Sequence, residues 1–123
     1  MGVRNDQELV ECVAQWGWIY HHLGIPTEEK RTEETYLAQF KFYVSGFPTS
    51  PFGVEWLRFE EDSPIHPLIQ TVPHLAFIVK DIDYELSNRK FNIITQPNSP
   101  SNGVRVAMIK HNDAPIELME FVV

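Results

Sequence analysis

Two short phrases of this 123-residue sequence each occur twice, in the same order, and every copy contains one side chain that can ligate a metal. The phrase HLGI at residues 22–25 returns as HLAF at residues 74–77, and each copy begins with histidine. The phrase VEWLRF at residues 54–59 returns as IELMEF at residues 116–121, with glutamate second in both. A polar residue repeated inside an apolar, strand-like phrase indicates that a structural unit has been duplicated.

The duplicated phrases supply two imidazoles and two carboxylates, from His22, Glu55, His74 and Glu117. The histidines are 52 positions apart and the glutamates 62, so each pair falls at matched places in two similar units. Neutral imidazoles and carboxylates together suit a borderline divalent cation such as zinc, nickel, cobalt or manganese. We therefore predict that the four residues bind one divalent metal ion. An inert site, inherited without function, is the alternative.

Strand geometry separates these candidates from their neighbours, because successive side chains of a strand point to opposite faces. His22 then shares a face with Gly24, and His74 shares one with Ala76. Small residues at both positions leave room beside each imidazole, which a packed core would rarely do twice. His21 falls on the opposite face from His22, so we exclude it as a ligand.

The remaining candidates for chemistry lie in less favourable places. His66 belongs to a proline-rich segment and His111 to a hairpin turn, so both are expected at the surface. Cys12 is the single cysteine, which precludes an intramolecular disulfide and fits a small core residue. Glu120 is one strand step out of register with Glu55 and is expected to face solvent.

Composition limits the classes of partner. A chain of this length is expected to form one domain spanning residues 1–123. The net charge of −7 argues against nucleic acid and against an anionic membrane surface. No apolar run is long enough to cross a bilayer or to act as a secretory signal, and the lone cysteine fits a reducing compartment. We therefore expect a cytoplasmic protein. Phosphate-binding glycine loops, paired-cysteine zinc spacings and nucleophile-elbow serines do not occur.

The apolar patterning predicts an α+β fold made of two similar units and one extra helix. Apolar residues at helical spacing place the extra helix at 6–16, ahead of the first unit at 17–60. The segment 61–71 contains two prolines and is the expected linker to the second unit at 72–122. Each unit reads as a strand, a short crossover, a strand and a hairpin strand. Strands are expected at 18–25, 36–44, 53–60, 72–79, 91–95, 104–109 and 115–122, a loop at 96–102, and a second helix at 82–88.

These phrases resemble the glyoxalase/bleomycin-resistance/dioxygenase group, the vicinal oxygen chelate superfamily. The resemblance covers residues 17–122. It rests on the two histidine phrases and on the C-terminal run from Gly103-Val104-Arg105-Val106-Ala107 to Pro115-Ile116-Glu117-Leu118. It implies two βαβββ modules that pair into a cup-shaped, mostly antiparallel sheet. It also implies metal ligands on the first and last strands of each module, which by position become the same four residues, His22, Glu55, His74 and Glu117.

The resemblance implies a metal-dependent lyase or isomerase that acts on a small oxygenated metabolite bound through vicinal oxygens, with Glu117 or Glu55 as the catalytic base. A second carboxylate disfavours a dioxygenase, whose iron takes two histidines and one carboxylate. The segment 26–35 is too short and too charged for the helix typical of glyoxalase I, so that activity is not expected.

Two other functions remain open. A metal-free protein of the bleomycin-resistance type would sequester a small molecule in the same cup, and an accessory domain would bind no ligand at all. A homodimer is expected in each case, because a short first module and an added apolar helix leave surface to cover. The aromatic residues expected to line the cup are Phe40, Phe42, Trp56, Phe59 and Phe77.

Overall fold

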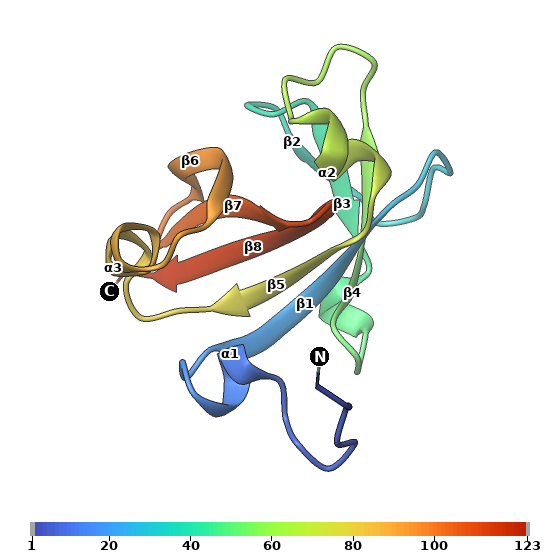
Figure 1. Ribbon diagram of the computed structural model, residues 1–123. Helices are drawn as coiled ribbons and strands as arrows, with labels where there is room; N and C mark the ends of the chain where they lie inside the picture. Colours follow the sequence, from blue (N-terminus) through green and yellow to red (C-terminus); the bar gives the residue numbers. More distant parts are fainter. Residues whose placement is uncertain (1, 123) are drawn as a thin grey trace.

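An eight-stranded, curled mixed sheet forms the body of the structure, a computed structural model that describes residues 2–122 (Figure 1). The strand order is β2-β3-β4-β1-β5-β8-β7-β6. The two ends of the sheet turn toward the same side, so that it forms a half-barrel, and the α+β, cup-shaped architecture expected from the sequence is confirmed. The strands are β1 (Ile19–Pro26), β2 (Thr35–Leu37), β3 (Phe42–Ser45), β4 (Val54–Phe59), β5 (His74–Ile78), β6 (Asn92–Ser101), β7 (Val104–His111) and β8 (Ala114–Phe121).

The sheet is built from two halves joined at their first strands. In the first half β1 pairs in parallel with β4, and in the second half β5 pairs in parallel with β8. Strands β1 and β5 pair antiparallel with each other, and all other neighbours in the sheet are antiparallel. The matched pairings relate the halves by an approximate two-fold operation, and the first and last strands of both halves meet at the centre.

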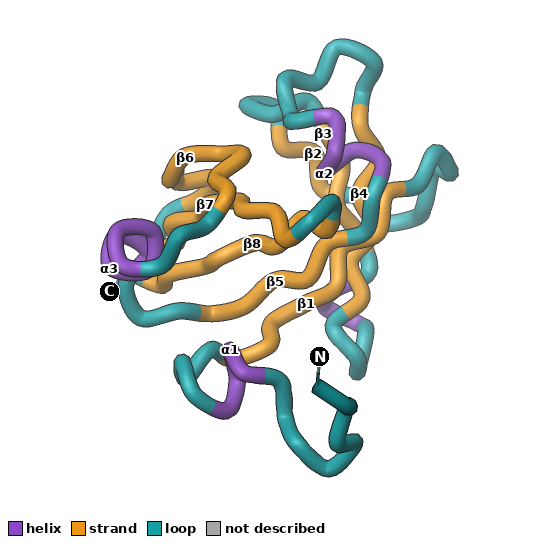
Figure 2. The backbone as a smooth tube through the Cα atoms, viewed as in Figure 1, coloured by secondary structure: helices purple, strands orange, loops and turns teal. Residues whose placement is uncertain are grey.

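Helices are short and contribute little to the architecture (Figure 2). Asp81 caps α3 by accepting a hydrogen bond from the backbone N–H of Tyr84. Between β1 and β2 the chain forms no helix, because residues 28–34 are all polar and offer no apolar stripe to pack. None of the helices in residues 2–122 is long and apolar enough to span a membrane. The helices are α1 (Glu11–Ala14), the 3-10 turn η1 (Phe47–Thr49), α2 (Pro67–Thr71) and α3 (Ile82–Asn88).

Three local expectations need correction. The helix expected at 6–16 is confined to the four residues of α1, because Asn5 caps a separate turn through Gln7 N–H and no side chain caps α1. The strand expected at 36–44 is a hairpin, β2–β3, in which Lys41 takes a positive φ of 55°. The loop expected at 96–102 belongs to β6, an edge strand that tolerates prolines and has three register shifts.

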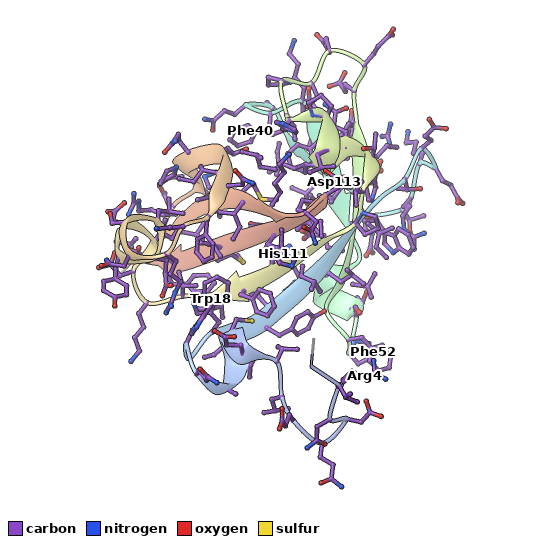
Figure 3. The ribbon with its side chains drawn as sticks, viewed as in Figure 1. Arg4, Trp18, Phe40, Phe52, His111 and Asp113 are labelled. Atoms are coloured by element: carbon purple, nitrogen blue, oxygen red, sulfur yellow. The ribbon has the colours of Figure 1, made fainter. Side chains whose placement is uncertain are left out.

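The buried apolar core lies on the outer, convex face of the second half, where α3 packs against β7 and β8. Trp18, labelled in Figure 3, belongs to this core and contacts Phe77 with ring centroids 5.7 Å apart. Side chains alternate between the two faces of each strand, so the core residues leave the intervening positions to the inner face. The core residues are Trp18, Phe77, Val79, Ile82, Ala107, Ile109 and Leu118.

Candidate metal centre

The central strands place one histidine and one glutamate on either side of a small residue. His22 on β1 pairs with Ala76 on β5, and Ala76 pairs in turn with Glu117 on β8. The imidazole and the carboxylate approach each other from the two strands that flank Ala76, and His22 Nε2 lies 3.4 Å from Glu117 Oε1. A larger side chain at residue 76 would separate these two groups.

A second set of three residues, paired across neighbouring strands, repeats this arrangement with the two halves of the sheet exchanged. Glu55 on β4 pairs with Gly24 on β1, and Gly24 pairs with His74 on β5. A Cβ atom built on Gly24 would lie 2.2 Å from His74 Cε1, so the imidazole occupies the space above the glycine. The sequence placed this room beside His22, on the same strand as Gly24. The structure shows instead that Gly24 of β1 makes room for His74 of β5.

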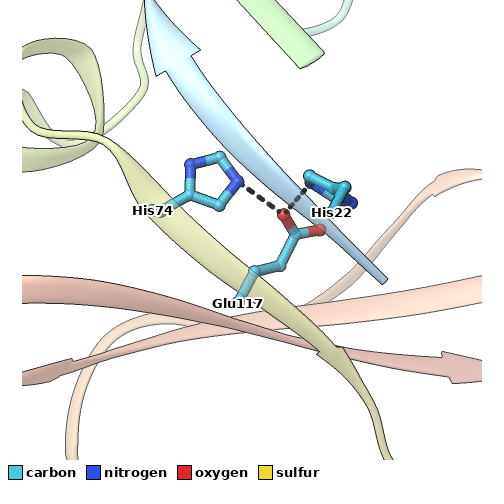
Figure 4. A group of neighbouring side chains, drawn as sticks. All are labelled: His22, His74 and Glu117. Carbon is cyan, nitrogen blue, oxygen red and sulfur yellow. Dashed lines mark hydrogen bonds and ion pairs between the residues drawn. The ribbon is translucent and has the colours of Figure 1, made fainter. Parts of the chain in front are cut away.

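Three of the four predicted residues form a compact cluster (Figure 4). Both Nε2 atoms point at the same carboxylate oxygen, because Glu117 Oε1 lies 3.0 Å from His74 Nε2 as well as 3.4 Å from His22 Nε2. The ligand atoms of the three residues lie within 4.8 Å of one another, and both histidines are buried. Glu55 lies at the edge of this cluster, with its Oε1 3.7 Å from His22 Nε2.

His21 lies beside the cluster, so the face predicted for it, opposite to His22, is wrong. A register shift between Tyr20 and His22 interrupts the alternation of β1 and turns His21 toward the inner face. Its Nδ1 lies 2.7 Å from Nδ1 of His22, and its ring stacks on Phe47 at 4.9 Å between centroids. Two adjacent histidines were the available signal, but nothing in the sequence marked the irregular strand.

The other polar candidates lie outside the cluster. His66 and His111 are exposed, as expected, and the ring of His66 caps α2. Cys12 is partly buried against the outer core. The solvent-facing placement expected for Glu120 is wrong, because its carboxylate accepts a hydrogen bond of 2.8 Å from the N–H of Ile82 at the start of α3.

The two carboxylates have opposite electrostatic environments. Burial alone would raise the pKa of Glu117, but its contacts with His22 and His74 outweigh burial and lower that pKa to about 2. Burial raises the pKa of Glu55, and the more distant charge on His22 only partly offsets this. Burial lowers the pKa of His22, but the contact with Glu117 outweighs it and raises that pKa above its ordinary value. Carboxylates shifted in opposite directions are suited to different roles.

A cavity of about 280 Å³ opens directly above the cluster, and His21, His22, Glu55, His74 and Glu117 all contribute to its lining. The remaining wall is mainly apolar and comes from both halves of the sheet. Its aromatic residues are Phe40, Phe42 and Phe59.

Two aromatic residues expected in this wall lie elsewhere. Trp56 points to the outer face, where the guanidinium of Arg31 lies over its ring, and Phe77 belongs to the outer core. Each follows directly after an inward-facing residue of its strand, Glu55 or Ala76, so strand alternation explains both placements.

The donor set fits a divalent ion. The Nε2 atoms of His22 and His74 both lie near the same oxygen of Glu117, and each can donate a proton to it. A divalent ion bound by these three atoms would take the place of those protons. The close approach of His74 to Gly24 holds its ring in place. His22 has a partner for its second ring nitrogen, as metal-binding histidines usually do, whereas Nδ1 of His74 is buried without one among residues 2–122.

Comparison with solved structures supports the fold. A hypothetical protein from Bacillus halodurans C-125 matches with a TM-score of 0.65 and 20% identity, covering 85% of this chain and 94% of that one. Methylmalonyl-CoA epimerase from Mycobacterium tuberculosis matches with a TM-score of 0.58 and 17% identity, covering 85% and 88% of the two chains. No family model matches the sequence, and no curated protein does. At these identities the likeness establishes a shared fold.

Proposed function

We propose that this protein is a metal-dependent isomerase or lyase that acts on a small molecule bound through two neighbouring oxygens. The observation that carries the proposal is the convergence of His22, His74 and Glu117, with Glu55 beside them, at the base of a cavity. The epimerase that shares this fold supports the reaction class, since epimerisation is an isomerisation. The resemblance of the sequence to the vicinal oxygen chelate superfamily supports it independently.

In this proposal His22, His74 and Glu117 hold the ion, and Glu55 completes the set or leaves it to move a proton. A divalent ion at this position supplies Lewis acidity, which stabilises negative charge that develops on a substrate oxygen. Glu117 contacts two imidazoles and stays ionised, so it is the fixed ligand. Glu55 has one distant contact and a raised pKa, which suits a general base at neutral pH.

The proton transfer balances in either reaction class. Glu55 takes a proton from a carbon next to a substrate carbonyl, and the electron pair of the C–H bond moves toward the carbonyl oxygen. Return of the proton to either face of the same carbon restores the carbonyl and completes an epimerisation. Return to the former carbonyl carbon completes an isomerisation when the hydroxyl proton on the first carbon passes to the former carbonyl oxygen, which leaves the new carbonyl on the first carbon. Departure of a leaving group from the adjacent carbon completes an elimination, which is lyase chemistry.

The test combines metal titration with proton exchange. Chelator-treated wild-type protein is titrated with zinc, nickel, cobalt and manganese, and the loaded protein is then incubated in D₂O with aryl and alkyl α-hydroxy ketones. We expect tight binding of at least one metal and deuterium incorporation at the carbon next to the carbonyl, measured by proton NMR. The Glu55→Gln variant should keep most of its metal affinity and lose exchange by roughly 10²–10⁴-fold. Glu61→Gln, the same change at an exposed residue outside the site, is the matched control.

The contrary results are specific. Exchange that continues unchanged after EDTA treatment, or that survives in Glu55→Gln, would contradict the assigned chemistry.

A second candidate function, metal-free sequestration, is favoured by the apolar wall of the cavity. It predicts ligand binding that EDTA does not affect and a protein that binds none of the four metals.

A further inference from the structure

We infer that the substrate carries an uncharged, apolar body, an aryl group or a short alkyl chain, attached to the two-oxygen head, and that the cavity does not accept an anionic group on this body. The position of the two-oxygen head, at the metal cluster, is taken from the proposed function. The nature of the body follows from the cavity wall, which the metal site does not determine.

The first observation is the charge of the wall. Apart from the histidines and glutamates of the site, the residues within 2–122 that line the cavity are uncharged, and none is lysine or arginine. The nearby cations are engaged elsewhere: Arg58 makes two hydrogen bonds of 2.8 Å to Glu34, and Lys41 lies 2.6 Å from Asp62. Away from the cluster, a phosphate or carboxylate on the substrate body would meet no lysine or arginine among these lining residues, and burying such an unpaired charge is costly.

The second observation is the shape and composition of the wall. On the side formed by the first half, Phe42 and Phe59 line the cavity, and their rings stack with centroids 4.9 Å apart. On the side formed by the second half, Met108 and Met119 supply flexible thioethers that adapt to the shape of a ligand. Ile69 of α2 also lines the cavity and adds to its apolar surface. An apolar group between these surfaces would contact both halves of the sheet.

The third observation is size. A cavity of about 280 Å³ lies just below the range of ~300–1,000 Å³ that is typical of pockets for drug-sized ligands. It accommodates a phenyl or hexyl group with its head at the cluster. Thr95, Asn98 and Ser101 of β6 are the polar residues of the wall away from the cluster, and they can accept or donate one neutral hydrogen bond.

The experiment measures binding of hydroxamates, whose paired oxygens represent the head, to the zinc-loaded protein. The series runs from acetohydroxamate to octanohydroxamate. A parallel series ends each chain in a carboxylate. We expect affinity to rise by about fourfold for every CH₂ group buried, until the cavity is full. We expect each carboxylate-ended probe to bind at least tenfold more weakly than its alkyl partner of equal length.

A variant pair tests the charge argument. Thr95→Lys places a cation on the edge strand that borders the cavity, whereas Thr95→Leu is a matched change without charge. Thr95→Lys should favour the carboxylate-ended probes and Thr95→Leu should not. Thermal melting shows whether both variants fold; if Thr95→Lys does not, the comparison of the two wild-type series decides alone.

Three outcomes overturn part of this reasoning. Affinity that does not depend on chain length, or equal binding of the two series, overturns the inference about the substrate body. A chain-length preference that persists after EDTA treatment supports that inference and overturns the proposed metal-dependent function. Failure of the zinc-loaded wild-type protein to bind any hydroxamate overturns both.

Discussion

Replacing Gly24 by alanine should displace His74 from the cluster. A Cβ atom at residue 24 would lie 2.2 Å from His74 Cε1 and 2.7 Å from both ring nitrogens, whereas ordinary contacts begin at 3.4 Å. The ring must therefore retreat by about 1.2 Å, while metal–ligand distances tolerate only about ±0.2 Å. We expect the variant to lose at least tenfold in metal affinity.

The same clash should lower the stability of the metal-free protein. Overpacking of a buried site costs about 1–3 kcal/mol. In the absence of a clash, alanine in a strand is favoured over glycine by roughly 0.5–1 kcal/mol, since glycine loses more backbone freedom on folding. The sign of the Gly24→Ala effect should therefore depend on the residue at position 74. It should destabilise the wild-type protein and be neutral or stabilising in a His74→Ala background.

Chemical denaturation of the four proteins in this double-mutant cycle provides the assay, with calorimetric metal titration of the two that retain His74. Gly2→Ala is the control, because a Cβ atom there meets nothing within 4 Å. Equal effects of Gly24→Ala in both backgrounds would refute the reasoning, since the cost would then have no connection with the imidazole. Unchanged metal affinity in the single variant would do so as well.

Four further predictions follow from the site and the sheet. Glu117→Gln should weaken metal binding more than Glu55→Gln, because only Glu117 contacts both imidazoles; equal affinities in a metal titration would contradict this. The raised pKa of His22 should stabilise the metal-free protein below the unfolded value of about 6.5, and this stability should disappear as pH rises through the folded pKa; denaturation midpoints that do not fall across this range would refute it. His21→Phe should preserve stacking on Phe47 but remove the Nδ1 partner of His22, lowering metal affinity by about 10–100-fold, and His21→Asn should restore much of it in the same titration. Exposed apolar side chains on β1 and β5 favour a homodimer, and a light-scattering mass that stays at one chain over a wide concentration range would exclude it.

Duplication was readable in the sequence because it leaves equivalent residues in equivalent phrases. His22 and His74, and Glu55 and Glu117, were paired by alignment alone, and the pairing implied two similar halves. Strand alternation then predicted the small residue beside each histidine. These inferences depend on local periodicity, which a sequence records directly.

Tertiary structure decided what periodicity does not encode. The β1–β5 register places Gly24 opposite His74, so the need for glycine arises from a side chain 50 positions away. A register shift in the β1–β5 pairing, between Tyr20 and His22, brings His21 beside the site against strict alternation. The unequal roles of the two glutamates likewise follow from distances. Glu55 and Glu117 occupy equivalent positions in the repeat, but the Glu117 carboxylate contacts both imidazoles and the Glu55 carboxylate lies near only that of His22.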